Sequence, residues 1–116
     1  MANTPIPPGG RPAILYVHGG TPRAGGGALA DQEARCRAKA DALGVVVAGL
    51  VVDEDPWGND PARAGIGRLV EMIRVAGDGS LVVAECPERL SRSVAVRRRI
   101  LQTIATAGAS AVFVSW

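Results

Sequence analysis

Two arginines, Arg89 and Arg92, lie three residues apart in the hexapeptide ERLSRS and are the side chains best suited to bind an anion. If this segment opens a helix, both guanidinium groups share a face near its electropositive end. Arginine binds phosphate oxygens through two parallel hydrogen bonds, so the pair could form a phosphate clamp. Arg63 follows a polar loop and could supply a third guanidinium. The alternative, which spacing alone favours, is that both are solvated or paired with the nearby Glu85 and Glu88.

A glycine-rich stretch, 19–27, offers a second chemistry, the binding of a nucleotide. Gly25 to Ala30 matches GxGxxA, and Asp53 ends the next apolar run, where a dinucleotide-binding fold places its ribose-binding acid. In that fold the first glycine directly follows the strand, whereas this triplet begins several residues after His18. No GxxxxGK[ST] motif is present, so a P-loop is excluded. We interpret the stretch as an irregular loop of small residues.

The remaining reactive side chains have structural interpretations. His18 is the only histidine and is interpreted as a polar residue at a strand end rather than a base. Cys36 and Cys86 lie far apart without a CxxC motif, which favours buried thiols over a disulfide or a metal site. Ser91 and Ser93 are suited to cap a helix. The sequence therefore predicts no metal and no cofactor.

Strands and helices alternate along the chain and must position these residues. Apolar runs predict strands at Pro12–His18, Val45–Val52, Leu81–Glu85 and Ala111–Trp116, and helices are expected over 28–43, 62–76 and 93–107. The almost uniformly apolar second run is typical of a strand covered on both faces. The order predicts an α/β domain in three layers, with a mainly parallel four-stranded sheet and helices on both faces.

Each predicted helix has one apolar face that should pack on the sheet. The residues expected to face inward are Leu29, Cys36, Ala40 and Leu43 in the first helix, Ile66, Leu69, Val70, Met72 and Ile73 in the second, and Val96, Ile100, Leu101 and Ile104 in the third. Arg97, Arg98 and Arg99 are expected to face largely outward. Ligands of such sheets bind beyond the carboxyl ends of the strands, where the glycine-rich loop, the loop 53–61 and the segment 85–92 should meet.

Length and composition restrict the classes of function that are possible. The 116 residues make one domain, 12–116, after a Pro/Gly-rich arm, 1–11, that we expect to be disordered and that has no signal-peptide features. No apolar run is long enough to span a bilayer, so a cytoplasmic protein without a membrane partner is expected. The net charge of +2 is too small to indicate nucleic acid by itself, so the placement of the arginines matters more than their sum.

The motifs taken together resemble the catalytic domain of serine recombinases, the resolvase/invertase family. ERLSRS after the run LVVAE is similar to the family's D-R-L-S-R-S segment, and AILYVHGGT is similar to its first strand, Y-A-R-V-S-T. The segment from Ala28 to Gln32, followed by Cys36 and Gly44, resembles the family's S-L-E-x-Q…C…G helix. Further similarities cover Asp53, the run from Ala62 to Leu69, and the final segment GASAVFVSW. The resemblance covers almost the whole chain.

The resemblance implies a DNA phosphate site that has lost its nucleophile. The family cleaves DNA with a serine that becomes joined to the 5′ end, while arginines stabilise the phosphate. Arg63, Arg89 and Arg92 match family arginines, and Asp53, Gln32 and Glu88 match its supporting polar residues. Gly20 stands where the serine should be and His18 where the family has an arginine. Thr21 matches the family's own threonine, not a relocated serine.

A further difference from the family is expected at the end of the chain. The family has a dimerisation helix and a DNA-binding module after this domain, and the sequence ends at the fourth strand. We therefore expect a catalytically inactive recombinase-like domain whose partners are the DNA backbone, bound weakly and salt-sensitively, or another copy or another recombinase. The alternatives are a small nucleotide- or phosphate-binding module and a protein-interaction domain without a ligand.

Overall fold

The computed structural model describes residues 11–19, 25–54 and 60–115. The predicted alternation of strands and helices is confirmed within these ranges. The elements are β1 (Pro12–His18), α1 (Gly25–Leu43), β2 (Val46–Asp53), α2 (Ala64–Ala76), β3 (Leu81–Ala84), the short 3₁₀ helix η3 (Pro87–Arg89), α3 (Val94–Thr106) and β4 (Ser110–Phe113).

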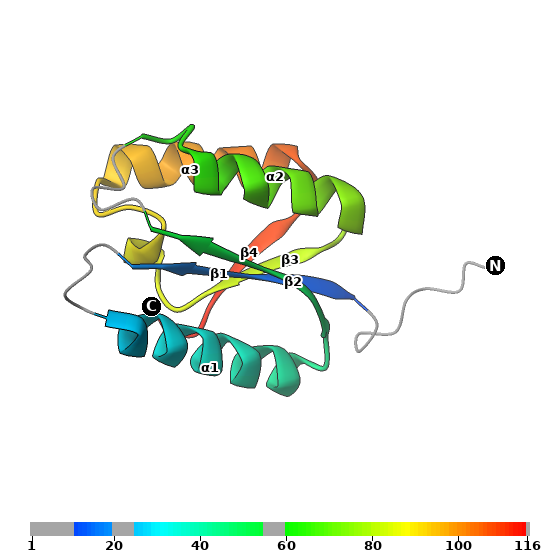
Figure 1. Cartoon of the computed structure of the whole chain (residues 1–116). Coiled ribbons are helices and arrows are strands. Elements are labelled where there is room, and N and C mark those ends of the chain that lie inside the picture. Colours follow the sequence, from blue (N-terminus) through cyan, green and yellow to red (C-terminus); the bar gives the residue numbers. More distant parts are fainter. Residues whose placement is uncertain (1–10, 20–24, 55–59, 116) are drawn as a thin grey trace.

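The strands form one parallel sheet in the order β2-β1-β3-β4. Helix α1 covers one face of this sheet, and α2 and α3 lie side by side on the other (Figure 1). The predicted fold class, a three-layer α/β domain with a parallel four-stranded sheet, is confirmed. None of the helices in the described part of the chain is long and apolar enough to cross a membrane.

Strand β1 is the centre of the core because helices cover both of its faces. Its side chains alternate between the two layers, as the period of two in a strand requires. Ala13 and Leu15 pack with Cys36 of α1. Ile14 and Tyr16 pack into the larger cluster beneath α2 and α3. The predicted inward residues Ile66, Leu69, Ile73, Ile100 and Ile104 are all buried there, while Val70, Met72, Val96 and Leu101 are partly buried.

The prediction that the second strand is covered on both faces is wrong. Strand β2 lies at the edge of the sheet, and Val46 and Val52 are 53% and 37% exposed. A uniformly apolar run does not distinguish a central strand from an edge strand whose outer side meets solvent. Leu43, expected to face inward, is also exposed, because it occupies the last turn of α1, where that helix ends at the sheet margin.

The predicted boundaries shift by one to three residues. Helix α1 begins at Gly25 and not at Ala28, so the glycine triplet belongs to its first turn rather than to the loop. The glycine triplet favours a loop because glycine is less favourable than alanine in a helix by about 1 kcal/mol, but that cost does not exclude glycine from a helical turn. Strands β3 and β4 end earlier than predicted, at Ala84 and Phe113.

The predicted arm lies outside the described residues except for its last member. Arg11 donates two hydrogen bonds from its guanidinium to the Gly79 carbonyl, at 2.9 and 2.6 Å, and its own carbonyl accepts from Val46. Arg11 therefore belongs structurally to the amino edge of the sheet.

The packing of α2 against β2 depends on the lack of a side chain at Gly65. A Cβ atom there would lie 2.4 Å from both Cγ and Oδ2 of the buried Asp53. Gly67, two residues further along the same helix, faces open space. No heavy atom outside its own helix backbone lies within 4 Å of the position that a Cβ atom there would occupy.

We predict that Gly65→Ala lowers the free energy of unfolding by about 1–3 kcal/mol, because overpacking displaces a buried carboxylate. Gly67→Ala is the matched control and should be neutral or stabilising by up to about 1 kcal/mol, because alanine is the better helix former. Urea denaturation of the two variants measures both effects, and equal stability of the two would contradict the prediction.

Candidate phosphate-binding site

At the carboxyl edge of the sheet, the side chain of Gln32 binds the backbone at the end of β1, a contact that we call the Gln32 clamp. The side chain of Gln32, from α1, is 1% exposed and binds both backbone groups of His18. Its Oε1 accepts from the His18 N–H at 2.9 Å, and its Nε2 donates to the His18 carbonyl at 2.8 Å. The amide thus pairs with the strand end as a neighbouring strand would, and it fixes the backbone leading to Gly19.

A buried ion pair links the ends of β1 and β2 to the start of α2. Arg63 donates from Nε to Asp53 Oδ2 at 2.7 Å, and both side chains are less than 5% exposed. Tyr16 donates its hydroxyl to the same Asp53 oxygen at 2.5 Å and accepts from Arg63 Nη2 at 2.7 Å. Each of the three side chains therefore forms a hydrogen bond with both of the others.

The electrostatics of this triad favour a charged pair beside a neutral phenol. Burial raises the pKa of Tyr16, and its hydrogen bond to the Asp53 carboxylate raises it further. Burial alone would lower the pKa of Arg63, but the attraction of Tyr16 and Asp53 outweighs that effect and the pKa lies above its ordinary value. The triad is therefore a structural brace at neutral pH.

Arg63 is not brought to the surface beside the other arginines. Besides Asp53 and Tyr16, its guanidinium donates to the carbonyls of Leu90 at 2.6 Å and Asp60 at 3.3 Å. Leu90 lies between Arg89 and Arg92 in the chain, so Arg63 holds the backbone from which both project. The predicted site residues Asp53 and Arg63 meet each other, and Gln32 meets His18.

Arg89 pairs with Glu85, which is one of the two possibilities that spacing leaves open. Arg89 Nε donates to Glu85 Oε1 at 2.9 Å, and Arg35 of α1 binds the other oxygen of the same carboxylate. Burial acts to raise the pKa of Glu85, but these two guanidinium groups lower it below its usual range. Sequence reasoning missed Arg35, although its position three residues after Gln32 places it on the same side of α1.

Arg92 is exposed and makes no hydrogen bond or ion pair with any residue that the structure describes. Its neighbours fix the backbone on either side, because Ser91 Oγ accepts from Ser93 N–H at 3.0 Å and Ser93 Oγ caps α3 at Val96 N–H. Ser93 is thus the predicted N-cap. Glu88 is exposed and lies 4.0 Å from Arg97, and its pKa is lowered by its own backbone N–H and by Cys86.

The edge therefore carries three guanidinium groups: those of Arg35 and Arg89, which share the Glu85 carboxylate, and that of Arg92, in the same segment as Arg89. Such an excess of partly exposed positive charge suits a phosphate, which arginine binds through paired N–H donors. Gly20 and Thr21 lie outside the described residues. The thiols of Cys36 and Cys86 are unpaired by any disulfide, and burial raises the pKa of Cys36 to about 11, which keeps it protonated.

We predict that Arg63→Met destabilises the fold by about 3–5 kcal/mol, because it leaves the Asp53 carboxylate buried without its counter-ion. Arg74→Met is the matched control, since Arg74 forms an exposed pair with Glu71 and should change stability by less than about 1 kcal/mol. Chemical denaturation measures the difference. A cost for Arg63→Met no greater than that for Arg74→Met would show that the buried pair does not hold the edge.

Comparison with solved structures finds the same fold in several recombinase domains. The N-terminal catalytic domain of TP901-1 integrase superposes with a TM-score of 0.75 at 22% identity, over 90% of this chain and 78% of that one. The C-terminal catalytic domain of ISC1926 TnpA, an IS607-like serine recombinase, gives 0.74 at 21% identity, over 89% and 69%. A resolvase family site-specific recombinase from Streptococcus pneumoniae gives 0.72 at 24%, over 90% and 72%.

A comparison with curated protein sequences gives no match. The family model described as the N-terminal domain of resolvase matches residues 16–115, from the tyrosine of the buried triad to the end of the described chain. That match begins within β1 and spans every later strand and helix, together with the site residues described above. The chain belongs to the resolvase N-terminal domain family.

Proposed function

We propose that this chain is a recombination-associated domain that binds DNA phosphates at the carboxyl edge of its sheet without cleaving the DNA. The family relation supports a role connected with recombination. The observation that carries the binding proposal is Arg92, an exposed guanidinium that pairs with none of the residues in the described part of the chain, near the partly exposed Arg89 in sequence.

The two arginines contribute differently to the proposed site. Arg92 can bind a phosphate without giving up a hydrogen bond or ion pair to any described residue, whereas Arg89 shares the Glu85 carboxylate with Arg35. A phosphate that binds Arg89 and Arg35 competes with Glu85 for the same donors. Glu85 therefore orients these two guanidinium groups and at the same time weakens their hold on an anion.

Arg63, Asp53 and Gln32 act in this proposal as positioning residues and not as phosphate ligands. Arg63 reaches the Leu90 carbonyl from inside the core and so sets the backbone that presents Arg89 and Arg92. Asp53 holds Arg63, and Gln32 fixes the end of β1. The same engagement of Asp53 argues against a nucleotide-binding alternative, because its carboxylate already serves Arg63 and Tyr16.

The absence of cleavage follows from the residues after β1. Gly20 occupies the position at which the family resemblance places the nucleophilic serine, and glycine has no nucleophile. His18 replaces an arginine at the same strand end. Thr21 is displaced by one residue, and a misplacement of about 1 Å already costs ~10²-fold in rate. Binding to a second copy or to an active recombinase would be the route by which such a domain acts.

We predict that incubation with labelled DNA gives no covalent protein–DNA adduct under conditions in which an active serine recombinase gives one. Denaturing gel electrophoresis detects the adduct through the retained label. An adduct that disappears in Thr21→Val would locate a nucleophile at Thr21 and overturn the proposed inactivity.

We predict that Arg92→Ala weakens binding of a labelled DNA duplex about tenfold at low salt and lowers the salt slope by about one, because one phosphate contact is lost. Glu85→Gln should instead strengthen binding, since it frees Arg35 and Arg89 from their carboxylate. Arg37→Ala on α1, which removes the same charge from an exposed pair with Glu33, is the control. Fluorescence anisotropy across a salt series measures all three. Superimposable curves for Arg92→Ala and Arg37→Ala would rule out the arginine edge as the binding site.

A further inference from the structure

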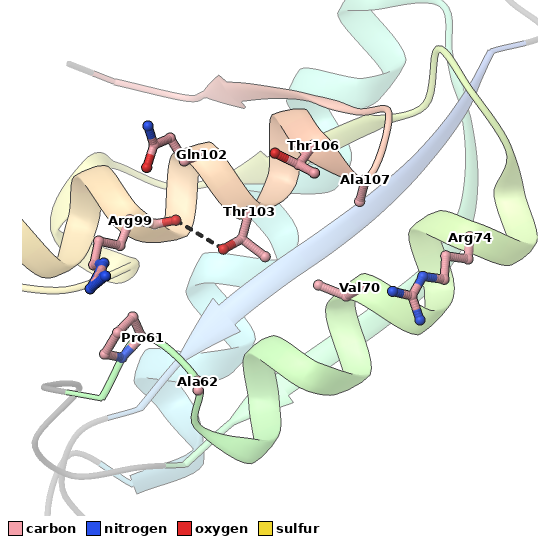
Figure 2. Close-up of a pocket in the computed structure, with 9 residues that line it drawn as sticks. All are labelled: Pro61, Ala62, Val70, Arg74, Arg99, Gln102, Thr103, Thr106 and Ala107. Atoms are coloured by element: carbon pink, nitrogen blue, oxygen red, sulfur yellow. Dashed lines mark hydrogen bonds between the residues drawn. The ribbon is translucent and has the colours of Figure 1, made fainter.

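A groove of about 880 Å³ runs between α2 and α3 on the outer face of the helical layer. Figure 2 shows Arg99 facing Pro61 at the end where α2 begins, and Arg74 at the far end. One face of α3 supplies most of its polar lining, through Arg99, Gln102, Thr103 and Thr106, which recur at the spacing of a helical face. The end of the groove at Pro61 and Arg99 lies where α2 begins, after the carboxyl end of β2.

The lining of the groove is basic and rich in hydrogen-bond donors. None of its nine residues is acidic. Arg74 is neutralised by Glu71 at 2.8 Å, but Arg99 is exposed and makes no hydrogen bond or ion pair through its side chain with the residues that the structure describes. Thr103 donates its hydroxyl to the Arg99 backbone carbonyl, so this hydrogen bond does not engage the guanidinium.

The position of Arg99 within α3 is electrostatically unfavourable for the isolated protein. Arg97, Arg98 and Arg99 lie in the amino-terminal half of a helix that contains no acidic residue. Adjacent positive charges repel one another, and an anion bound beside them relieves that repulsion. Arg97 has Glu88 as a counter-ion, but Arg98 and Arg99 have none among the described residues. Residues that break a local stability rule are expected where a ligand compensates for them.

We propose that this groove binds one sugar–phosphate strand of the DNA held at the carboxyl edge, with Arg99 as its principal phosphate ligand. The inference rests on the proposed function and extends the contact surface beyond Arg92. Arg99 lies in the second turn of α3 and faces Pro61, two residues before Arg63, so this end of the groove adjoins the elements that meet at the carboxyl edge (Figure 2). Gln102 and Thr106 offer neutral donors to the same backbone further along the groove.

The test compares two adjacent arginines of the same helix. Arg98 and Arg99 are both exposed and carry the same charge, but only Arg99 lines the groove. Arg99→Ala should weaken binding of a labelled duplex about tenfold at low salt and lower the salt slope by about one. Arg98→Ala should have a clearly smaller effect, because it changes only the long-range field. Arg92→Ala is measured alongside, and unchanged melting temperatures confirm that each variant is folded.

The outcomes separate this inference from the proposed function. Equal losses of DNA affinity in Arg98→Ala and Arg99→Ala, or no loss in Arg99→Ala, overturn the groove as a binding site. A loss of affinity in Arg92→Ala would still support the carboxyl edge as a binding site. A loss in Arg99→Ala with none in Arg92→Ala supports the groove and rejects the edge as the main site. No binding by the unmodified protein at low salt overturns both.

Discussion

The buried pair of Asp53 and Arg63 is the interaction on which the carboxyl edge of this domain depends. Two charges removed from water are costly unless each finds full hydrogen bonding, and here Tyr16 and the Leu90 carbonyl complete the set. The pair joins the ends of two strands, the start of α2 and the segment after β3. Its geometry in turn requires Gly65, since any side chain there would meet the Asp53 carboxylate.

The buried brace of Tyr16, Asp53 and Arg63 supports the site, whereas other side chains form the part of it that meets solvent. Arg63 is committed to the core, whereas Arg92 faces solvent on a backbone that Arg63 and two serine hydroxyls fix. Arg89 is intermediate, because Glu85 restrains it without burying it. A change in the exposed arginines would alter affinity for an anion with little effect on folding, and a change in Arg63 would do the reverse.

The sequence predicts the layers, the parallel sheet and the convergence at one edge, because apolar periodicity and the order of the elements determine them. It does not predict that β2 is an edge strand, because apolar residues such as Val46 and Val52 occur both in covered central strands and in partly exposed edge strands. It groups Arg63 with Arg89 and Arg92 because the three share a residue type and a sheet edge. Only the packing of Asp53 beneath Gly65 shows that Arg63 points into the core.

The division between brace and exposed arginines makes the fold independent of the side chain at Gly20, the position that the family resemblance assigns to the nucleophile. The Gln32 clamp acts on the backbone of His18, so the end of β1 is fixed whatever side chain follows at Gly20. The Asp53–Arg63 pair is bound by the Tyr16 hydroxyl and by the Leu90 and Asp60 carbonyls, none of which belongs to the segment that carries Gly20. Retention of the brace is therefore a requirement of stability and carries no information about catalysis. Arg92 is exposed and has no pairing partner within 11–19, 25–54 and 60–115, so no such structural reason explains it there, and it is this residue that argues for a bound anion.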